Sequence, residues 1–204
     1  GVHYIDYLIA DSTLIPEDQQ RHYSEKIVYL PDSYQVNDSK LAIADKPMTK
    51  AGCGLPENAF VFCCFNNNFK IVPAVFDIWM RLLARVEKSV LWLLLDNAVV
   101  VRNLRAEAQS RGIAADRIVF APRVPVADHL ARHRLADLFL DTLPYNAHTT
   151  ASDALWAGLP VLTCKGRAFG GRVAASLLTA IGLSELVTDS LEAYEALALR
   201  LATE

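Results

Sequence analysis

From residue 59 onward, short apolar runs alternate with segments whose apolar positions recur at helical spacing. Runs such as FVFCCF (60–65) and VLWLLL (90–95) are continuous rather than polar at every second position. Continuous apolar runs are typical of parallel strands that helices cover on both faces. The pattern therefore predicts an α/β fold with a doubly wound, Rossmann-like parallel sheet. We expect strands at 59–65, 89–95, 117–121, 136–141, 160–164 and 185–188, and helices at 71–85, 99–111, 127–134, 148–157, 171–181 and 190–203.

The N-terminal part of the chain has a different pattern. Residues 3–10 are rich in β-forming residues, 16–25 form a polar helical stretch, and 27–30 resemble a short strand. Residues 31–56 hold three prolines and no sustained period, which predicts a linker and places a domain boundary near residue 50. The chain begins without Met and ends in a helical pattern, so we expect a piece of a longer protein.

Composition and charge narrow the classes of partner. The 204 residues are 52% apolar and 21% charged, which is typical of a globular chain. A formal net charge of −3 leaves no excess of cations for a phosphate backbone, and the apolar runs are far shorter than the roughly 20 residues of a membrane-spanning helix. The four cysteines lack C-x-x-C spacing and no signal peptide opens the chain. We therefore expect reduced thiols in a cytoplasmic protein, with neither nucleic acid nor membrane as a partner.

Ligands of doubly wound sheets bind beyond the carboxyl ends of the strands, so the loops there are the places to look for chemistry. The loop after the fourth core strand runs directly into a helix that starts with His148, Thr149 and Thr150. Unpaired N–H groups, two hydroxyls and the positive end of the helix dipole predict an anion site, and a diphosphate fits it. The alternative is simple capping, because Thr150 and Asp153 also satisfy the S/T-x-x-D pattern of a helix start.

The loop after the first core strand offers a cation for the same edge of the sheet. It reads Asn66-Asn67-Asn68-Phe69-Lys70, and Lys70 would add a full positive charge beside neutral amide donors. The alternative is a lysine that is merely solvated. The sequence has no D-x-D pair or carboxylate cluster of the kind that holds Mg²⁺ or Mn²⁺. We therefore expect no metal, with Lys70 and the helix N–H groups stabilising a departing diphosphate.

Two histidines on one predicted helix allow three interpretations. His129 and His133 are four residues apart, the spacing of a zinc pair, but the Glu of H-E-x-x-H is missing and no third ligand is evident. His129 could instead pack near a ligand base together with Arg132, one turn further on. The third interpretation is an ordinary surface pair.

Several segments share a resemblance to one known family, and they are residues 23–35, 63–73, 89–95, 117–125, 129–163 and 170–178. They resemble the catalytic region of the O-linked N-acetylglucosamine transferases, in a form closer to bacterial than to animal members. This family consists of inverting GT-B glycosyltransferases that transfer GlcNAc from UDP-GlcNAc to Ser or Thr of proteins. The resemblance implies that residues 1–48 are the tail of the N-terminal lobe with the interlobe linker, and that 49–204 form the C-terminal, nucleotide-sugar-binding lobe.

The resemblance also implies roles for individual residues. Lys70 contacts the diphosphate and stabilises the leaving UDP, while His148, Thr149 and Thr150 hold the phosphates. Asp153 binds the ribose. The uracil is flanked and read by His129, Arg132 and the backbone near Val124.

Three positions depart from the animal enzymes. Val126 stands where they have Lys, so one ribose or phosphate contact is missing, and Asn67 stands where they have Gln, so another contact is shortened. Tyr145 replaces a Cys, for which we expect little consequence.

The leading hypothesis is the donor-binding half of a metal-independent protein O-glycosyltransferase, with no cofactor and with UDP-GlcNAc as donor substrate. The acceptor protein would bind to parts outside this chain, including upstream tetratricopeptide repeats, and we expect no turnover by the chain alone. The alternatives are a sugar-nucleotide 2-epimerase-like GT-B enzyme and a catalytically silent nucleotide-sugar-binding module.

Overall fold

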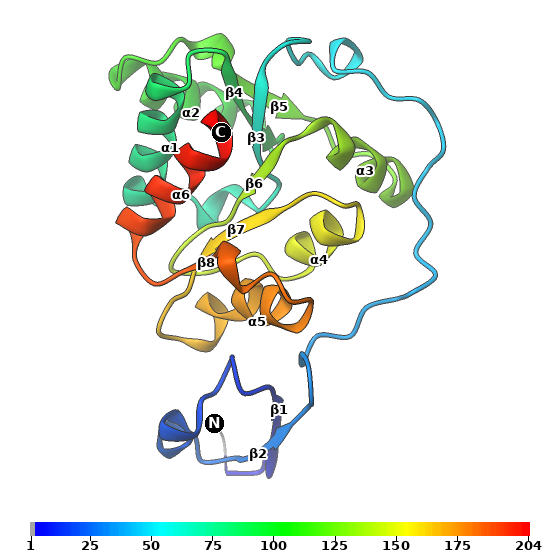
Figure 1. Cartoon of the computed structure of the whole chain (residues 1–204), viewed down its shortest axis with the longest axis vertical. Helices are drawn as coiled ribbons and strands as arrows, with labels where there is room; N and C mark the ends of the chain where they lie inside the picture. The colour runs from blue at the N-terminus through cyan, green and yellow to red at the C-terminus, as the bar shows by residue number, and fades with distance from the viewer. Residues whose placement is uncertain (1–2) are drawn as a thin grey trace.

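A computed structural model describes residues 3–204 and contains two parallel sheets (Figure 1). Among these residues, the larger sheet has six strands in the order β5-β4-β3-β6-β7-β8. Each neighbouring pair is parallel, as the continuous apolar runs predict. The strands are β3 (Phe60–Cys64), β4 (Ser89–Leu94), β5 (Ile118–Ala121), β6 (Leu138–Leu140), β7 (Val161–Cys164) and β8 (Val187–Thr188).

Helices connect consecutive strands of this sheet and cover it. Helices α1, α2 and α6 lie together on one side, and α3, α4 and α5 follow one another on the other side (Figure 1). The predicted α/β alternation is confirmed, with boundaries that shift by at most two residues. The helices are α1 (Pro73–Arg85), α2 (Ala98–Ser110), α3 (Val126–Arg132), α4 (Thr149–Trp156), α5 (Val173–Ala180) and α6 (Leu191–Thr203).

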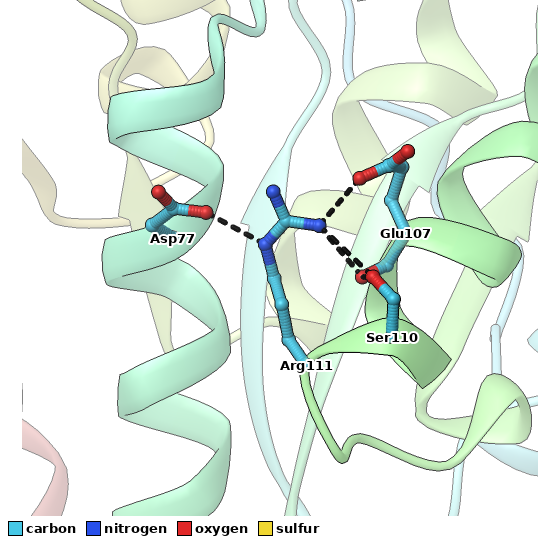
Figure 2. A network of polar contacts seen from close by, with 4 residues as sticks. All are labelled: Asp77, Glu107, Ser110 and Arg111. Carbon is cyan, nitrogen blue, oxygen red and sulfur yellow. Dashed lines mark hydrogen bonds and ion pairs between the residues drawn. The ribbon is translucent and has the colours of Figure 1, made fainter.

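Local sequence signals start helices α1 and α2, and ion pairs of Arg111 connect the two helices. Pro73 occupies the first turn of α1, where its missing N–H is not needed, and the Asn97 side chain caps α2 by accepting from two backbone amides. Figure 2 shows how Arg111, which follows α2, donates to Asp77 of α1 at 2.6 Å and to the Glu107 carboxylate at 2.5 Å. These partly exposed ion pairs contribute at most about 1 kcal/mol each, so the apolar core supplies most of the stability.

The core lies on both faces of the sheet. Trp79 of α1, Trp92 of β4 and Tyr194 of α6 are among the largest fully buried side chains. Cys63 and Cys64, adjacent on β3, are both completely buried, as expected of a strand covered on both faces. The four cysteines are free thiols. Within residues 3–204, no helix combines the length and apolarity that crossing a bilayer requires.

The N-terminal unit is a small parallel sheet of β1 (Tyr7–Ala10) and β2 (Lys26–Tyr29). The polar helical stretch predicted over 16–25 is present in a shorter form, as a 3-10 helix at Glu17–His22. None of its residues is buried. A short segment without an apolar face to bury gains too little from packing to extend into an α-helix.

Residues 31–56 form an extended segment along the larger unit. Apart from a 3-10 turn at Ala51–Cys53, this fully described segment contains no helix or strand. It is nevertheless attached to α4, because Gln35 donates to the Ser152 hydroxyl at 2.6 Å and Trp156 donates to the Leu41 carbonyl at 3.0 Å. Hydrogen bonds therefore hold the linker against the C-terminal unit. The domain boundary near residue 50 stays a prediction.

Candidate functional site

The order of strands reverses between β3 and β6, and this is the place where doubly wound sheets bind ligands. The chain leaves β3 toward α1 and leaves β6 toward α4 on the other face, so the two connecting loops diverge. A cavity of about 770 Å³ lies at this edge. All nine predicted site residues line it, so the structure brings the predicted site together. They are Asn67, Lys70, Val124, His129, Arg132, His148, Thr149, Thr150 and Asp153.

Lys70 ends a 3-10 turn, Asn68–Lys70, between β3 and α1. Its Nζ donates to the Asn146 carbonyl at 2.9 Å and lies 4.4 Å from the centre of the Tyr145 ring. Partial burial lowers the pKa of Lys70, whereas the Asp141 carboxylate acts in the opposite direction. The side chain is thus anchored inside the cavity rather than freely solvated.

Helix α4 begins at the cavity without a side-chain cap. His148 occupies the N-cap position, and the amides of Ala151 and Ser152 donate to its carbonyl. The amides of Thr149 and Thr150 precede these first helical hydrogen bonds, so they are available at the positive end of the helix dipole. The capping interpretation of Thr150 is wrong, because His148 holds the N-cap and the Thr150 hydroxyl donates to Asn66.

A buried carboxylate that the sequence analysis did not select supports both loops. Asp141 follows β6, and its Oδ1 accepts from the amides of Thr142 at 2.7 Å and Ala147 at 2.6 Å. Its Oδ2 accepts from the Thr163 hydroxyl at 2.7 Å, and the Asn66 amide group lies at 3.3 Å from Oδ1. Complete burial raises the pKa of Asp141 to about 6, although these hydrogen bonds act against the shift. The sequence feature that could have identified Asp141 is its position as an acidic residue directly at the end of a predicted strand.

A cluster around α3 forms the opposite wall of the cavity. The Arg132 guanidinium lies 4.6 Å from the centre of the Phe65 ring and donates to the Pro122 carbonyl at 2.6 Å. It also contacts Nδ1 of His129 at 2.5 Å. Burial lowers the pKa of Arg132 to about 10, a value that keeps the guanidinium charged at neutral pH.

The histidine pair belongs to this cluster. The surface-pair interpretation is wrong, because His133 is fully buried with Nδ1 at 2.8 Å from the His129 carbonyl. Within residues 3–204, no three His, Cys, Asp or Glu side chains come together as a metal site would require. The arrangement fits the second interpretation, in which His129 and Arg132 face a ligand.

The remaining predicted residues lie at the rim. Val124 and Val126 are 37% and 58% exposed, and Asn67 is exposed. Asp153 is half-buried on α4, and desolvation raises the pKa of its carboxyl. The cavity also has lining residues that the sequence analysis did not select, among them Phe65, Asn66, Phe69, Leu94, Arg123 and Tyr145. The individual roles of the nine predicted residues stay predictions.

The buried imidazoles make stability depend on pH. Burial lowers the pKa of His129 to about 3 and that of His133 to about 4 in the folded chain. Below about pH 6.5 the unfolded chain therefore binds more protons at these histidines than the folded chain does. The free energy of unfolding should therefore fall as the pH drops from about 6.5 toward 4. Asp141 acts in the opposite direction between about pH 6 and 4, and Asp153 adds to it, because burial raises the pKa of both carboxyls. Burial also lowers the pKa of His148, so we expect the histidines to dominate.

Urea unfolding at several pH values measures this net effect, and imidazole NMR shifts report each histidine. We expect His129 and His133 to keep neutral-form shifts down to pH 5. Titration of either ring near pH 6.5, together with unchanged stability, would contradict the prediction.

The fold and the cavity define a Rossmann-like unit with a cavity at the reversal of strand order, lined by a cation and a helix N-terminus. Residues 45–204 match the family described as Glycosyl transferase family 41. The chain belongs to this family.

Two curated relatives are similar to the chain over most of its length. The protein named "Probable UDP-N-acetylglucosamine--peptide N-acetylglucosaminyltransferase SEC" of Arabidopsis thaliana is 41% identical, covering 99% of this chain and 21% of that protein. The UDP-N-acetylglucosamine--peptide N-acetylglucosaminyltransferase of Caenorhabditis elegans is 40% identical, covering 76% of this chain and 14% of that protein. The chain thus spans about a fifth or less of the length of these relatives.

Solved structures confirm the predicted fold class, the C-terminal lobe of a GT-B glycosyltransferase with a doubly wound sheet. A mutant O-GlcNAc transferase of Thermobaculum terrenum superposes with a TM-score of 0.85 at 34% identity, over 98% of this chain and 38% of that chain. A sucrose-phosphate synthase of Thermosynechococcus elongatus superposes with a TM-score of 0.56 at 17% identity, which shows a shared fold alone.

Proposed function

We propose that the chain is the donor-binding half of a metal-independent, inverting glycosyltransferase that transfers GlcNAc from UDP-GlcNAc to Ser or Thr hydroxyls of proteins. One observation carries the proposal: the Lys70 ammonium and the uncapped N-terminus of α4 line a single cavity at the reversal of strand order. Family membership and the names of the relatives support the choice of donor and acceptor.

The site suits the departure of a diphosphate. The acceptor hydroxyl oxygen attacks the anomeric carbon as the bond from that carbon to the phosphate oxygen breaks. The electron pair leaves with UDP, and the hydroxyl proton passes to solvent or to the departing diphosphate. Charge therefore develops on the phosphates, where Lys70 and the amides of Thr149 and Thr150 are already positioned. Preorganised donors of this kind stabilise a transition state without reorganisation at the moment of reaction.

The opposite wall suits the nucleoside. His129, which burial keeps neutral, and Arg132, which lies over Phe65, provide an aromatic face and a cation for the uracil. The backbone near Val124 lies at the same wall, and Asp153 on α4 would accept hydrogen bonds from the ribose. An extended nucleotide-sugar would thus reach from α3 across to α4.

In this proposal, residues 1–48 are the tail of a separate N-terminal lobe together with the interlobe linker. Residues 49–204 are the donor-binding lobe. The two-stranded parallel sheet of the N-terminal unit leaves Tyr7, Ile9 and Val28 between 41% and 60% exposed. Parallel strands normally have both faces covered, and an isolated pair is marginal in water. The greater length of the relatives supports further segments that would cover this sheet and bind the acceptor.

The chemistry favours transfer over epimerisation. A 2-epimerase-like enzyme needs catalytic carboxylates at the sugar, whereas Asp153 is the one carboxylate among the described residues that line the cavity. We also propose a cytoplasmic location, supported by four free cysteines. The partners are UDP-GlcNAc and a protein acceptor, with no nucleic acid or membrane.

Calorimetric titration of the chain with UDP, UDP-GlcNAc and UDP-glucose tests the donor site. We expect UDP and UDP-GlcNAc to bind with the same affinity in EDTA and in Mg²⁺, because Lys70 and the α4 amides neutralise the diphosphate in this proposal. Binding that EDTA abolishes would refute the metal-free account. Absence of UDP binding by the chain, and by the longest form of the protein that the cell makes, would refute the proposed function.

A further inference from the structure

We propose that Tyr145 is a positioning residue for Lys70: its ring holds the ammonium at the point where the diphosphate binds. This inference rests on the proposed function for the identity of the ligand. The contact between the two side chains can be tested without any ligand.

Two groups hold the Lys70 ammonium, and both come from the loop that follows β6. The Asn146 carbonyl accepts a hydrogen bond from Nζ at 2.9 Å, and the centre of the Tyr145 ring lies 4.4 Å from the same atom. An ammonium over a tyrosine ring is attracted by the negative face of the π system. With one N–H bonded to a carbonyl, the remaining N–H groups stay free to donate to a phosphate oxygen.

The ring itself is fixed from several sides. It stacks on the His148 imidazole, with ring centres 4.8 Å apart and an angle of 18° between the planes. The Tyr145 carbonyl accepts from the Thr142 hydroxyl at 2.8 Å, and the next amide, that of Asn146, donates to the Gly170 carbonyl at 2.8 Å. The backbone at the base of the ring is therefore held on both sides.

The lack of a side chain at Gly170 leaves the space that the Tyr145 ring occupies. A Cβ atom at residue 170 would lie 2.9 Å from Cε2 of Tyr145, closer than real Cβ contacts allow. The position of the ring therefore requires glycine at 170. The Gly170 carbonyl also lies 3.2 Å from Nε2 of His148, so one turn supports both members of the stack.

The physical benefit is preorganisation. A free lysine side chain loses rotamer entropy when it binds a phosphate, and a chain that is already held loses less. Tyr145 is 49% exposed and lines the cavity, so the ring can act there without closing the site. Such a role contradicts our expectation that having Tyr where the animal enzymes have Cys has little consequence.

A double-mutant cycle tests whether Tyr145 acts through Lys70. Tyr145→Leu should weaken UDP binding about 5- to 30-fold, the effect of a partly desolvated cation–π contact, whereas Tyr145→Phe, which keeps the ring, should change it less than about twofold. In a Lys70→Met background, Tyr145→Leu should have an effect of less than about twofold. The same loss in both backgrounds would overturn the proposal, because the ring would then act independently of the lysine.

Three further measurements complete the test. Gly170→Ala should displace the ring and reproduce part of the Tyr145→Leu effect. Tyr7→Leu removes an exposed tyrosine whose ring centre lies 6.0 Å from Nζ of Lys26 in the N-terminal unit, and it should leave UDP affinity unchanged. Thermal unfolding confirms that each variant is folded.

NMR separates this proposal from the proposed function. The Lys70 Hε protons should be shifted upfield by the ring current in the full chain and in Tyr145→Phe, and the shift should disappear in Tyr145→Leu. Absence of the shift in the unsubstituted chain overturns the positioning role, whatever UDP does. A clear shift without any UDP binding would refute the proposed function and leave the contact established.

Discussion

Lys70→Ala is expected to lower the rate of glycosyl transfer about 10²- to 10³-fold, the usual cost of removing one preorganised donor from a developing oxyanion. In the proposed reaction, charge develops on the phosphates as UDP leaves, and Lys70 is the group at that end of the cavity with a full charge and a fixed position. The dipole of α4 contributes only roughly 0.3–2 kcal/mol. The lysine should therefore dominate the stabilisation of the leaving group.

The measurement uses the longest form of the protein that the cell makes, since acceptor binding lies outside the chain in this proposal. UDP affinity of the variant should fall by less than the rate, because the interaction strengthens in the transition state. Lys88→Ala is the matched control: this exposed lysine directly precedes β4, at the amino edge of the sheet and away from the cavity. Unchanged transfer by Lys70→Ala would refute the role of Lys70.

The sequence was sufficient for the fold and for the general location of the site. Continuous apolar runs separated by helical segments specify parallel strands, and the carboxyl ends of parallel strands meet at one edge. Residues as distant as Lys70 and Thr149 could therefore be placed in one cavity without knowledge of any contact. The resemblance to a family then supplied Val124, which carries no local signal of its own, and a ribose-binding role for Asp153, whose local signal was that of a helix start.

The residues that support the site could not be predicted in the same way. The partners of Asp141 come from its own loop, from Asn66 in the loop after β3 and from Thr163 on β7, so they depend on how β6 pairs with β3 and with β7. The position of Tyr145 over Lys70 depends likewise on the turn at Gly170. Such contacts follow from tertiary register, which a local pattern does not encode.

The helical stretch predicted at 16–25 is shorter than expected for a related reason. Polar residues at helical spacing indicate that a helix is possible, but most helical stability comes from packing an apolar face. The segment at Glu17–His22 has no buried residue and remains a 3-10 helix. Helices α1 and α5 were predicted well because each of them buries such a face.

Asp141→Ala is expected to lower the free energy of unfolding by about 3–5 kcal/mol, because it leaves several buried donors without an acceptor. The amides of Thr142 and Ala147 and the Thr163 hydroxyl all donate to this carboxylate, which is 2% exposed. Asp141→Asn should cost less, because burial already raises the pKa of this carboxyl to about 6 and a neutral side chain avoids the desolvation of a charge. Urea unfolding measures both variants.

Asp137→Ala provides the matched control at the other end of β6. Its carboxylate accepts one hydrogen bond, from the Val61 amide at 2.7 Å, and its side chain is 41% exposed. The expected loss is about 1 kcal/mol, so equal losses for Asp137→Ala and Asp141→Ala would contradict the prediction.

Asp141→Ala should also weaken the binding of UDP. Its carboxylate binds Ala147, which directly precedes the N-cap of α4, and contacts Asn66, which accepts from the Thr150 hydroxyl. Loss of the carboxylate removes the common support of the two loops that face the diphosphate. UDP binding by the folded fraction of Asp141→Ala should therefore be weaker than in the unsubstituted chain, while Asp137→Ala binds normally. Equal affinity of the folded proteins would mean that the loops keep their geometry without this carboxylate.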